Sequence, residues 1–439
     1  MTRTAIYNAR LVDPASGTDC QGGLIFSSDG VIIESGAHLF QAPSNVELAI
    51  DAQGHVLAPG VIDLRVKTGE PGNENKETLA TASAAAAAGG ITSFLVMPDT
   101  SPVIDTVALV DFINRRARDT AKSARVYAAG GLTVGLKGER MTEIGLMLEA
   151  GARLFSNGEQ AVEDIGLLRR AMQYAAGFNA IVMSRPDIHS LTRGSMMNSS
   201  AFASRLGLKG APPLAELMAV ERDLILAEMT GVRLLVDQIS TARALEAVER
   251  ARDRGVKVWC TVSANNLYFN EMDVGDYLTY CKVFPPFRSE EDRLAMIDGV
   301  ARGSIDAVVS AHDPQPPEDK RLPLPEATFG AAGLETLISA LISLVQDERL
   351  SLIDALRPLT SAPADILGVP QGRLAAGAPA DMILVDIGAP WECVREDLRS
   401  RSQNSPFDGR RLQGRVVRTF LNGLTVFDRK AEMLAEQGA

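Results

Sequence analysis

The chain has 439 residues, of which 46% are hydrophobic and 23% are charged, and its formal net charge is −11 at pH 7. These are the proportions of a folded globular protein, and the length suits one large domain with a smaller companion. An acidic balance without a long lysine or arginine run disfavours attraction to nucleic acid or to an anionic membrane. We therefore expect neither a nucleic-acid partner nor a membrane partner.

The chain start, MTRTAIYNARLVDPASG, has no apolar stretch after its charges, so no secretory signal is predicted and a cytoplasmic location is expected. No window reaches the roughly 18 apolar residues of a membrane span. The four cysteines form no CxxC pair, which disfavours a zinc knuckle or a disulfide framework. Only four histidines are present in the whole chain, which leaves few candidates for metal ligands.

Both ends of the chain predict β structure. Short apolar runs alternate with turn signals over residues 1–57, as in GLIFSSDGVIIESG, and the same texture returns in GAPADMILVDIG and GRVVRTFLNGLTVFD. The economical arrangement is one small β-sandwich that residues 1–57 and 368–439 build together.

Between these ends, residues 58–367 alternate apolar strands with helical periods. The predicted strands are GVIDLRV, ITSFLVMPDT, ARVYAAGGL, ARLFSNG, NAIVMS, VRLLVDQIS, VKVWCTVS and IDAVVSAH. Repeated strand-helix units favour an α/β fold, specifically a closed (β/α)8 TIM barrel. A run of helices is predicted over 333–368, and the proline-rich segment 313–330 predicts a mobile barrel loop. Two AAGG segments, at 87–90 and 128–131, lack the spacing of phosphate loops and predict tight strand-helix turns.

Several long segments resemble class I dihydroorotases of the amidohydrolase superfamily. They are APGVIDLRVKTGEPGNENKETLATASAAAAAGGITSFLVMPDTSPVID, GAPPLAELMAVERDLILAEMTGVRLLVDQIST, CKVFPPFRSEEDR, FGAAGLETLISALI and GRLAAGAPADMILVD. The resemblance runs almost end to end and implies the fold. Function has to be argued from the site.

The resemblance also implies a metal site, because the family uses one or two divalent metals, usually zinc, held by imidazoles and carboxylates. In this chain the matching positions are Arg65 and Lys67 for a His-x-His pair, Asn157 for a bridging aspartate, and Ser184 and Gln238 for histidines. A protonated guanidinium or ammonium group cannot ligate zinc. We therefore expect no metal cofactor and treat these positions as vestigial.

The last predicted strand ends in AHDPQ where the family has Asp-His-Ala-Pro-His. Ala311 thus stands in place of the aspartate that ligates metal and shuttles protons, so no catalytic residue is expected. Asp313 is a weak candidate because it would have to reach back into the cavity. His312 is another weak candidate, since its position is not a metal ligand in the family and packing of the loop explains it better.

The positions that the resemblance assigns to substrate binding have changed as well. They are Gly69 for an arginine, Asp99 and Phe284 for asparagines, and Gln315 for a histidine. Elsewhere around the barrel, Asn265 and Asn266 stand where the family has a pair of histidines. A carboxylate at position 99 would repel an anionic substrate. Losing one member of a catalytic unit costs orders of magnitude in rate and further losses then add little, so decay of the whole site is expected.

Arg65 and Lys67 need an account of their own, because a cation at a barrel mouth is costly unless it is paired or hydrated. One hypothesis is that they pair with Asp99, Asp237 or Asp313. The alternative is that both side chains reach solvent through an enlarged cavity.

Together with the resemblance, these losses predict a non-catalytic, dihydroorotase-like protein of pyrimidine biosynthesis. Inactive homologues of this kind act as structural partners of aspartate carbamoyltransferase, so that enzyme is the expected partner, and self-association is expected too. Two alternatives stay open. One is an amide or cyclic-imide hydrolase with a rebuilt or metal-poor site, and the other is a scaffold that senses a small metabolite in its pocket.

Overall fold

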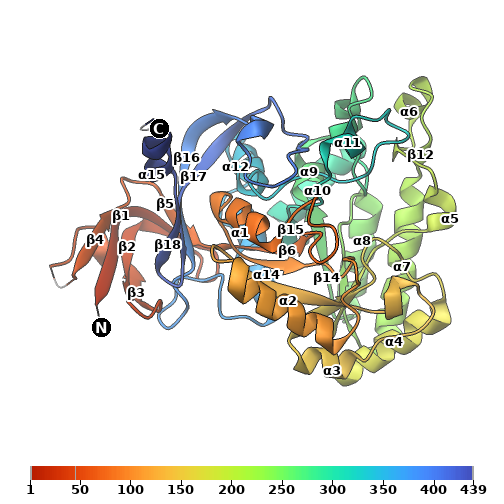
Figure 1. Ribbon diagram of the computed structural model, residues 1–439, viewed down its shortest axis with the longest axis horizontal. Helices are drawn as coiled ribbons and strands as arrows, with labels where there is room; N and C mark the ends of the chain where they lie inside the picture. The colour runs from red at the N-terminus through yellow and green to blue at the C-terminus, as the bar shows by residue number, and fades with distance from the viewer. Residues whose placement is uncertain (1, 45, 438–439) are drawn as a thin grey trace.

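The computed structural model describes residues 2–44 and 46–437 and contains a parallel barrel beside a sheet that both chain ends build (Figure 1). The barrel strands follow the order β15-β14-β13-β10-β9-β8-β7-β6, and the paired neighbours are all parallel. In chain order they are β6 (Val61–Val66), β7 (Ile91–Val96), β8 (Arg125–Gly131), β9 (Ala152–Ser156), β10 (Ile181–Ser184), β13 (Arg233–Val236), β14 (Val258–Ser263) and β15 (Ala307–Val309).

The first and last strands meet at the barrel mouth. The backbone N–H of Lys67 donates to the carbonyl of His312 at 2.9 Å, and Val66 forms a parallel bridge with His312. The predicted (β/α)8 barrel is confirmed.

Helices cover the outside of the barrel and lie in its loops. The outer helices are α1 (Leu79–Ala88), α2 (Val107–Thr120), α3 (Ile144–Glu149), α4 (Ile165–Gly177), α7 (Pro213–Thr230), α8 (Ala242–Asp253) and α10 (Glu290–Ala301). The short elements are α5 (His189–Thr192), α6 (Ala201–Arg205), α9 (Ala264–Tyr268), α11 (Pro317–Lys320), β11 (Met197–Asn198) and β12 (Gly210–Ala211). The predicted helical run is present as α12 (Leu337–Gln346), α13 (Leu352–Leu356) and α14 (Ser361–Leu367).

The terminal sheet has the order β18-β17-β16-β5-β1-β2-β3, with β4 paired to β1. Its strands are β1 (Arg3–Asp13), β2 (Thr18–Ser27), β3 (Ile32–Gly36), β4 (Leu48–Asp51), β5 (Val56–Pro59), β16 (Met382–Glu392), β17 (Arg411–Leu421) and β18 (Leu424–Asp428), and α15 (Arg429–Gln437) follows. Both chain ends thus build one β module, as predicted. Strand β5 crosses the predicted boundary at residue 58, and the exact domain limits stay a prediction.

Small residues bring the two parts close together. Helix α1 consists mostly of alanines whose side chains are buried, and the Thr419 hydroxyl of β17 donates to the carbonyl of Ala87 at 2.7 Å. Gly90 has a φ of +79°, so the first AAGG segment is a tight turn, as predicted. The second lies inside β8, and a Cβ on Gly130 would come within 2.8 Å of Phe155. The turn predicted there was wrong, because those glycines serve close packing.

Within residues 2–44 and 46–437, no helix has the length and apolar character that crossing a membrane requires.

Candidate functional site

Seven charged residues, from the ends of six barrel strands, meet at the carboxyl ends of these strands. Parallel strands present these ends at one edge, so residues that follow different strands come together there. We call this set the ion-pair cluster, and its members are Arg65, Lys67, Asp99, Glu159, Arg185, Asp237 and Asp313.

Arg65 is the buried centre of the cluster. Its side chain is 2% exposed, its Nε donates to Asp237 Oδ2 at 2.7 Å, and its guanidinium also contacts Glu159. Burial alone would lower the pKa of Arg65, but Glu159 and Asp237 outweigh it and hold that pKa above its ordinary value. The predicted pairing with Asp237 is present, and the alternative in which Arg65 reaches solvent is wrong.

Lys67 places its ammonium group among three carboxylates. Its Nζ lies 2.8 Å from Glu159, 2.9 Å from Asp99 and 3.1 Å from Asp313. Burial alone would lower the pKa of Lys67, but the negative charges of Asp313, Asp99 and Glu159 outweigh this effect and hold the pKa above its ordinary value. The pairing predicted with Asp99 and Asp313 is therefore present, and Lys67 stays protonated.

Arg185 completes the cluster from the end of β10. Its guanidinium lies 3.3 Å from Glu159 and 3.8 Å from Asp237, and it stacks over the Phe284 ring at 5.0 Å. Burial raises the pKa of Glu159, but Lys67, Arg65 and Arg185 outweigh it and hold that pKa well below its ordinary value. Three cations and four carboxylates thus offset one another in a small volume.

Gln238 bridges the two guanidinium groups. With its amide oxygen turned toward them, it accepts hydrogen bonds from Arg65 Nε at 2.5 Å and from Arg185 at 2.8 Å. Gln238 has a φ of +55° and Ala311 a φ of +53°, a left-handed conformation that strains side chains other than glycine. Two of the vestigial positions therefore keep a strained backbone at strand ends.

A divalent metal does not fit this set of residues. The carboxylates that could attract it, those of Asp99, Glu159 and Asp313, already surround the Lys67 ammonium, and the guanidinium groups of Arg65 and Arg185 would repel a second cation. Across the described part of the chain, no group of three or more histidine, cysteine, aspartate or glutamate side chains could hold a metal.

Asn157 and Ser184, two more of the positions that the resemblance assigns to metal ligands, belong to local structure. The Asn157 oxygen accepts from the Thr133 hydroxyl at 2.5 Å, and its amide nitrogen donates to the carbonyls of Leu136 and Gln160 at 2.9 and 3.1 Å. Ser184 ends β10 and is buried. Asn157 could turn toward a ligand in the mouth only by breaking these bonds.

The two weak catalytic candidates point to different surroundings. Asp313 joins the cluster, and its second oxygen accepts from Gln315 Nε2 at 2.8 Å, so both oxygens are engaged. His312 is buried, accepts the backbone N–H of Gly333 on Nδ1 at 3.2 Å, and places Nε2 3.4 Å from Glu77. The side chain of Ala311 offers no group that could move a proton.

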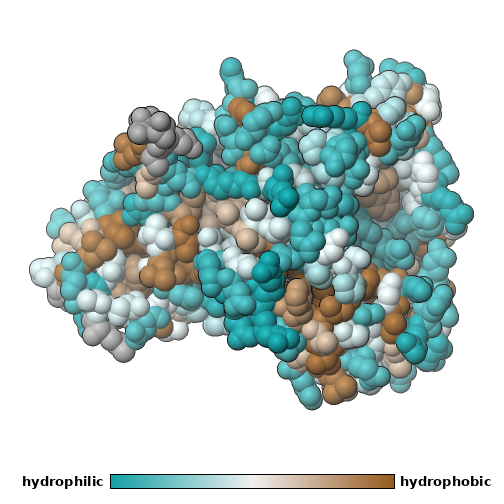
Figure 2. Space-filling view, in the orientation of Figure 1, coloured by the Kyte–Doolittle hydropathy of each residue, from teal (hydrophilic) through white to brown (hydrophobic). Residues whose placement is uncertain are grey.

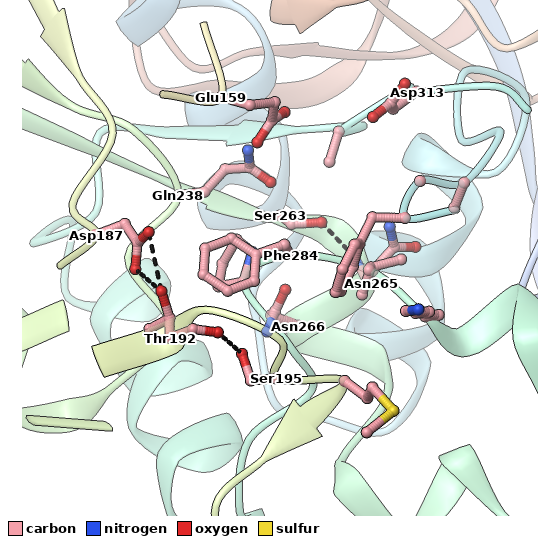
Figure 3. A pocket seen from close by; sticks show the side chains of 18 of the residues that line it. Glu159, Asp187, Thr192, Ser195, Gln238, Ser263, Asn265, Asn266, Phe284 and Asp313 are labelled. Atoms are coloured by element: carbon pink, nitrogen blue, oxygen red, sulfur yellow. Dashed lines mark hydrogen bonds between the residues drawn. The ribbon is translucent and has the colours of Figure 1, made fainter. Parts of the chain in front are cut away.

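A cavity of about 320 Å³ remains beside the cluster, and Figure 3 looks into it. Phe284 lines it, and in this view Gln238 and Glu159 lie above the Phe284 ring, Asn266 lies below it and Asn265 lies to its right. The amide nitrogen of Asn266 donates to the carbonyl of Pro286 at 2.9 Å, while its oxygen has no hydrogen-bond partner among the described residues.

A second cavity of about 370 Å³ lies on the Lys67 side, and its lining includes Gly69, Asp99 and Gln315, three positions that the resemblance assigns to substrate binding. Gly69 has a φ of +71°, and its carbonyl accepts the N–H of Asn73 at 2.7 Å, so it serves a turn. The two cavities share Glu159 as a lining residue, and the ion-pair cluster therefore borders both.

The predicted loop at 313–330 is tied down by a buried lysine. Lys282 Nζ donates to the carbonyls of Leu324, Pro325 and Ala327 at 2.6 to 3.1 Å. Burial lowers the pKa of Lys282. Pro325 lines the first cavity, so this anchor fixes part of its wall.

Glu159 and Arg185 were not anticipated as site residues. Charge balance gave a signal for Arg185 alone, because the three carboxylates proposed at the mouth exceed the two cations by one negative charge. Both residues also follow predicted strands closely, Glu159 in LFSNGE and Arg185 in VMSRPD.

Comparisons with known proteins agree with this architecture. A family model described as Dihydro-orotase-like matches residues 54–244, and one described as Amidohydrolase family matches residues 223–426. A dihydroorotase of Wolbachia sp. subsp. Drosophila simulans (strain wRi) is 37% identical over 430 residues, covering 98% of this chain and 96% of the relative. One from Desulforapulum autotrophicum is 39% identical over 381 residues, covering 87% and 89%.

Among solved structures, the L-hydantoinase (dihydropyrimidinase) from Arthrobacter aurescens matches with a TM-score of 0.88 at 26% identity, covering 98% of this chain and 97% of that one. The dihydropyrimidinase from Brevibacillus agri matches with a TM-score of 0.83 at 20% identity, covering 98% and 96%. The second likeness concerns the fold alone.

Proposed function

The chain belongs to the dihydroorotase-like family of the amidohydrolases, and from this premise we propose that it is a non-catalytic member with a structural role in pyrimidine biosynthesis. The observation that carries the proposal is the ion-pair cluster. Lys67 Nζ, held at 2.8 to 3.1 Å from three carboxylates, stands at a position where the resemblance places a metal-binding histidine. A hydrolytic water would need that metal for its activation.

Repair of the reaction by a single residue is disfavoured on energetic grounds. Members of a catalytic unit act together, so a site without its metal ligands, its proton shuttle and its substrate clamp retains almost none of the original rate enhancement. Asp313 could supply a carboxylate, but both of its oxygens are engaged by Lys67 and Gln315.

We further propose aspartate carbamoyltransferase as the partner that the barrel supports. The similarity to dihydroorotases spans 98% of the chain, whereas this chain lacks the metal-binding and substrate-binding residue types that the resemblance assigns to the barrel mouth. Selection that preserves the fold but not the hydrolytic reaction would produce a chain with this overall similarity and without these site residues. Such a role requires the barrel and the terminal sheet to stay packed, and it requires nothing of the mouth.

The test is light scattering on a size-exclusion column with this chain and the aspartate carbamoyltransferase of the same cell. We expect co-elution at a defined mass, and separate elution across micromolar concentrations would remove the partner role. The same preparation, supplied with zinc or manganese, is expected to show no turnover of dihydroorotate.

A second candidate is a hydrolase of an amide or cyclic imide with a rebuilt site. The cavity of about 320 Å³ favours it, because an abandoned pocket has no need to stay open and this one keeps polar amides on Asn265 and Asn266. Turnover of hydantoins or related imides that is lost in an Asp313→Asn variant would establish this candidate and overturn the non-catalytic proposal.

A further inference from the structure

The cavity of about 320 Å³ at the barrel mouth has an aromatic wall that suits a flat ring. Phe284 and Phe329 both line it, and their ring centroids lie 6.0 Å apart with an angle of 84° between the rings. Arg185 lies 5.0 Å from the Phe284 centroid, and Lys282 lies 4.8 Å from that of Phe329. These cations help to hold the rings in place, so the cavity offers a fixed surface on which a ligand ring can stack.

Two buried amides in the same wall keep hydrogen-bonding atoms for a ligand. Asn266 is 3% exposed, and its amide nitrogen donates to the carbonyl of Pro286 at 2.9 Å, but its oxygen has no partner among the described residues. Asn265 is 2% exposed, and its side chain makes no hydrogen bond within the described part of the chain. Buried polar atoms are normally paired, because leaving one unpaired is costly. A ligand N–H can pair with the oxygen of Asn266, and the amide of Asn265 can both donate and accept.

Charge distinguishes two ends of this cavity. In Figure 3 Glu159, a carboxylate of the ion-pair cluster, lies above Phe284, whereas Thr192 lies below it. Arg193 directly follows α5, over which Figure 2 shows mainly hydrophilic side chains, and its exposed side chain lines the cavity without an ion pair to the described residues. Asp187, beside Thr192, is buried and accepts its hydroxyl at 2.8 and 3.1 Å. An anionic group of a ligand is therefore best placed at Arg193, away from the cluster.

A flat ring, an amide edge and an anion occur together in one class of ligand, the nucleoside monophosphates. A nucleobase stacks on aromatic side chains and bonds to asparagine amides through its N–H and acceptor groups. A phosphate matches the planar fork of a guanidinium group. The cavity lies at the lower end of the roughly 300–1,000 Å³ that small-molecule sites occupy, which favours a single-ring pyrimidine over a larger purine.

We propose that this cavity binds a pyrimidine nucleoside monophosphate, with its base between Phe284 and the two amides and its phosphate at Arg193. Asn265 and Asn266 stand where the resemblance places histidines, and Phe284 stands where it places an asparagine, so these contacts belong to this chain. The proposal goes beyond the proposed function, because binding of this kind needs neither a metal nor hydrolysis.

Isothermal titration calorimetry of the full chain tests the proposal, with uridine monophosphate as the probe. We expect saturable binding of one nucleotide per chain. Uridine and inorganic phosphate should each bind at least about tenfold more weakly, because each lacks one of the two recognised groups. Methylation of the ring N–H between the two uracil carbonyls should weaken binding at least about fivefold, because it removes the donor for Asn266. Adenosine monophosphate should bind more weakly than uridine monophosphate or cytidine monophosphate.

Three variants assign the contacts. Arg193→Gln should weaken the binding of uridine monophosphate at least about tenfold and leave that of uridine unchanged. Phe284→Leu should weaken both at least about fivefold, because it removes the stacking surface. Arg321→Gln is the matched control, since Arg321 is an exposed arginine of the segment 313–330 outside the cavity lining, and it should change nothing. Thermal melting confirms folding of each variant, and the methylated nucleotide tests the amide contact without altering the protein.

Absence of saturable binding by both pyrimidine nucleotides would refute the site. Equal affinities for uridine and its monophosphate would show that no phosphate is recognised, and equal effects of Arg193→Gln and Arg321→Gln would remove the assigned contact, so either result overturns the proposal. The nucleotide is recovered after titration and should be intact. Hydrolysis of dihydroorotate and co-elution with aspartate carbamoyltransferase are measured separately, so the proposed function and this binding site can fail independently.

Discussion

Replacing Arg65 by methionine removes the buried centre of the ion-pair cluster while keeping a side chain of similar length. The change leaves Asp237, which is buried, without its closest cation at 2.7 Å, and leaves Glu159 with Lys67 and Arg185 only. We expect a large loss of stability and no change in the fold of the terminal sheet.

The magnitude follows from the burial of both partners. Breaking a buried ion pair by removing one member costs about 3–5 kcal/mol, because the remaining charge stays desolvated and unpaired. Unfolding entropy grows with chain length, so for a barrel of this size that loss corresponds to a decrease of roughly 5–8 °C in melting temperature. A surface pair provides the comparison. Arg302 is 58% exposed and lies 3.2 Å from Glu249, and Arg302→Met should cost at most about 1 kcal/mol.

The assay is thermal unfolding followed by circular dichroism, with denaturant titration of both variants at neutral pH. If Arg65→Met destabilises no more than Arg302→Met, the cluster is not a buried network that stabilises the mouth. A further variant, Arg65→Met with Asp237→Asn, should recover part of the loss, since it removes the stranded charge.

Three other substitutions test separate features of the mouth. Asp63 lies in β6, accepts the backbone N–H of Arg65 at 3.1 Å and is fully buried. Burial raises the pKa of Asp63 to about 6 from 3.8, so its contribution to stability is present below 3.8 and lost as the pH rises through 6. Denaturant titrations should therefore show the wild type losing about 3 kcal/mol relative to Asp63→Asn over that range, and a constant difference would contradict this. Ala311→Gly should raise the free energy of unfolding by up to about 1 kcal/mol, because glycine adopts a φ of +53° without strain. Ala307→Gly, within β15, is the control and should lower the melting temperature. Equal shifts in the melting temperatures of the two variants would refute strain at Ala311. The double variant Arg65→His with Lys67→His should bind zinc at least about tenfold more tightly than the wild type in equilibrium dialysis, and it should still not turn over dihydroorotate. Equal zinc affinities of the variant and the wild type would refute the conclusion that Arg65 and Lys67 exclude a metal.

The barrel could be predicted because its strands are buried on both sides. Strands β6 and β7 each have four apolar residues out of six and are buried along their whole length, and they alternate with helical periods, which is the pattern of a parallel sheet covered by helices. Residues 128–131 were predicted both as the end of the strand ARVYAAGGL and as a turn, because small residues suit a turn as well as a crowded strand, and the structure has the strand. Only the neighbouring side chains, such as Phe155 beside Gly130, distinguish the two.

The candidate site was predictable in outline. The pairing of Arg65 and Lys67 with carboxylates follows from the cost of burying a charge, which sequence reasoning can apply without coordinates. The participation of Glu159 could not be predicted from this cost, because it depends on how far the turn after β9 extends across the barrel mouth toward Lys67. Arg185 was missed for the same reason, since neighbouring residues at a strand end can point to opposite sides.

The position of β5 between β1 and β16 has a consequence for synthesis of the chain. Strand β5 ends at Pro59, but β16, which pairs with it, begins only at Met382. The β5–β16 pair in the middle of the terminal sheet therefore cannot form until most of the chain has been translated. At about 5–20 residues per second the wait is on the order of 15–65 s, during which β5 presents an unpaired edge. The nascent chain is thus exposed to wrong strand pairing until its last strands emerge.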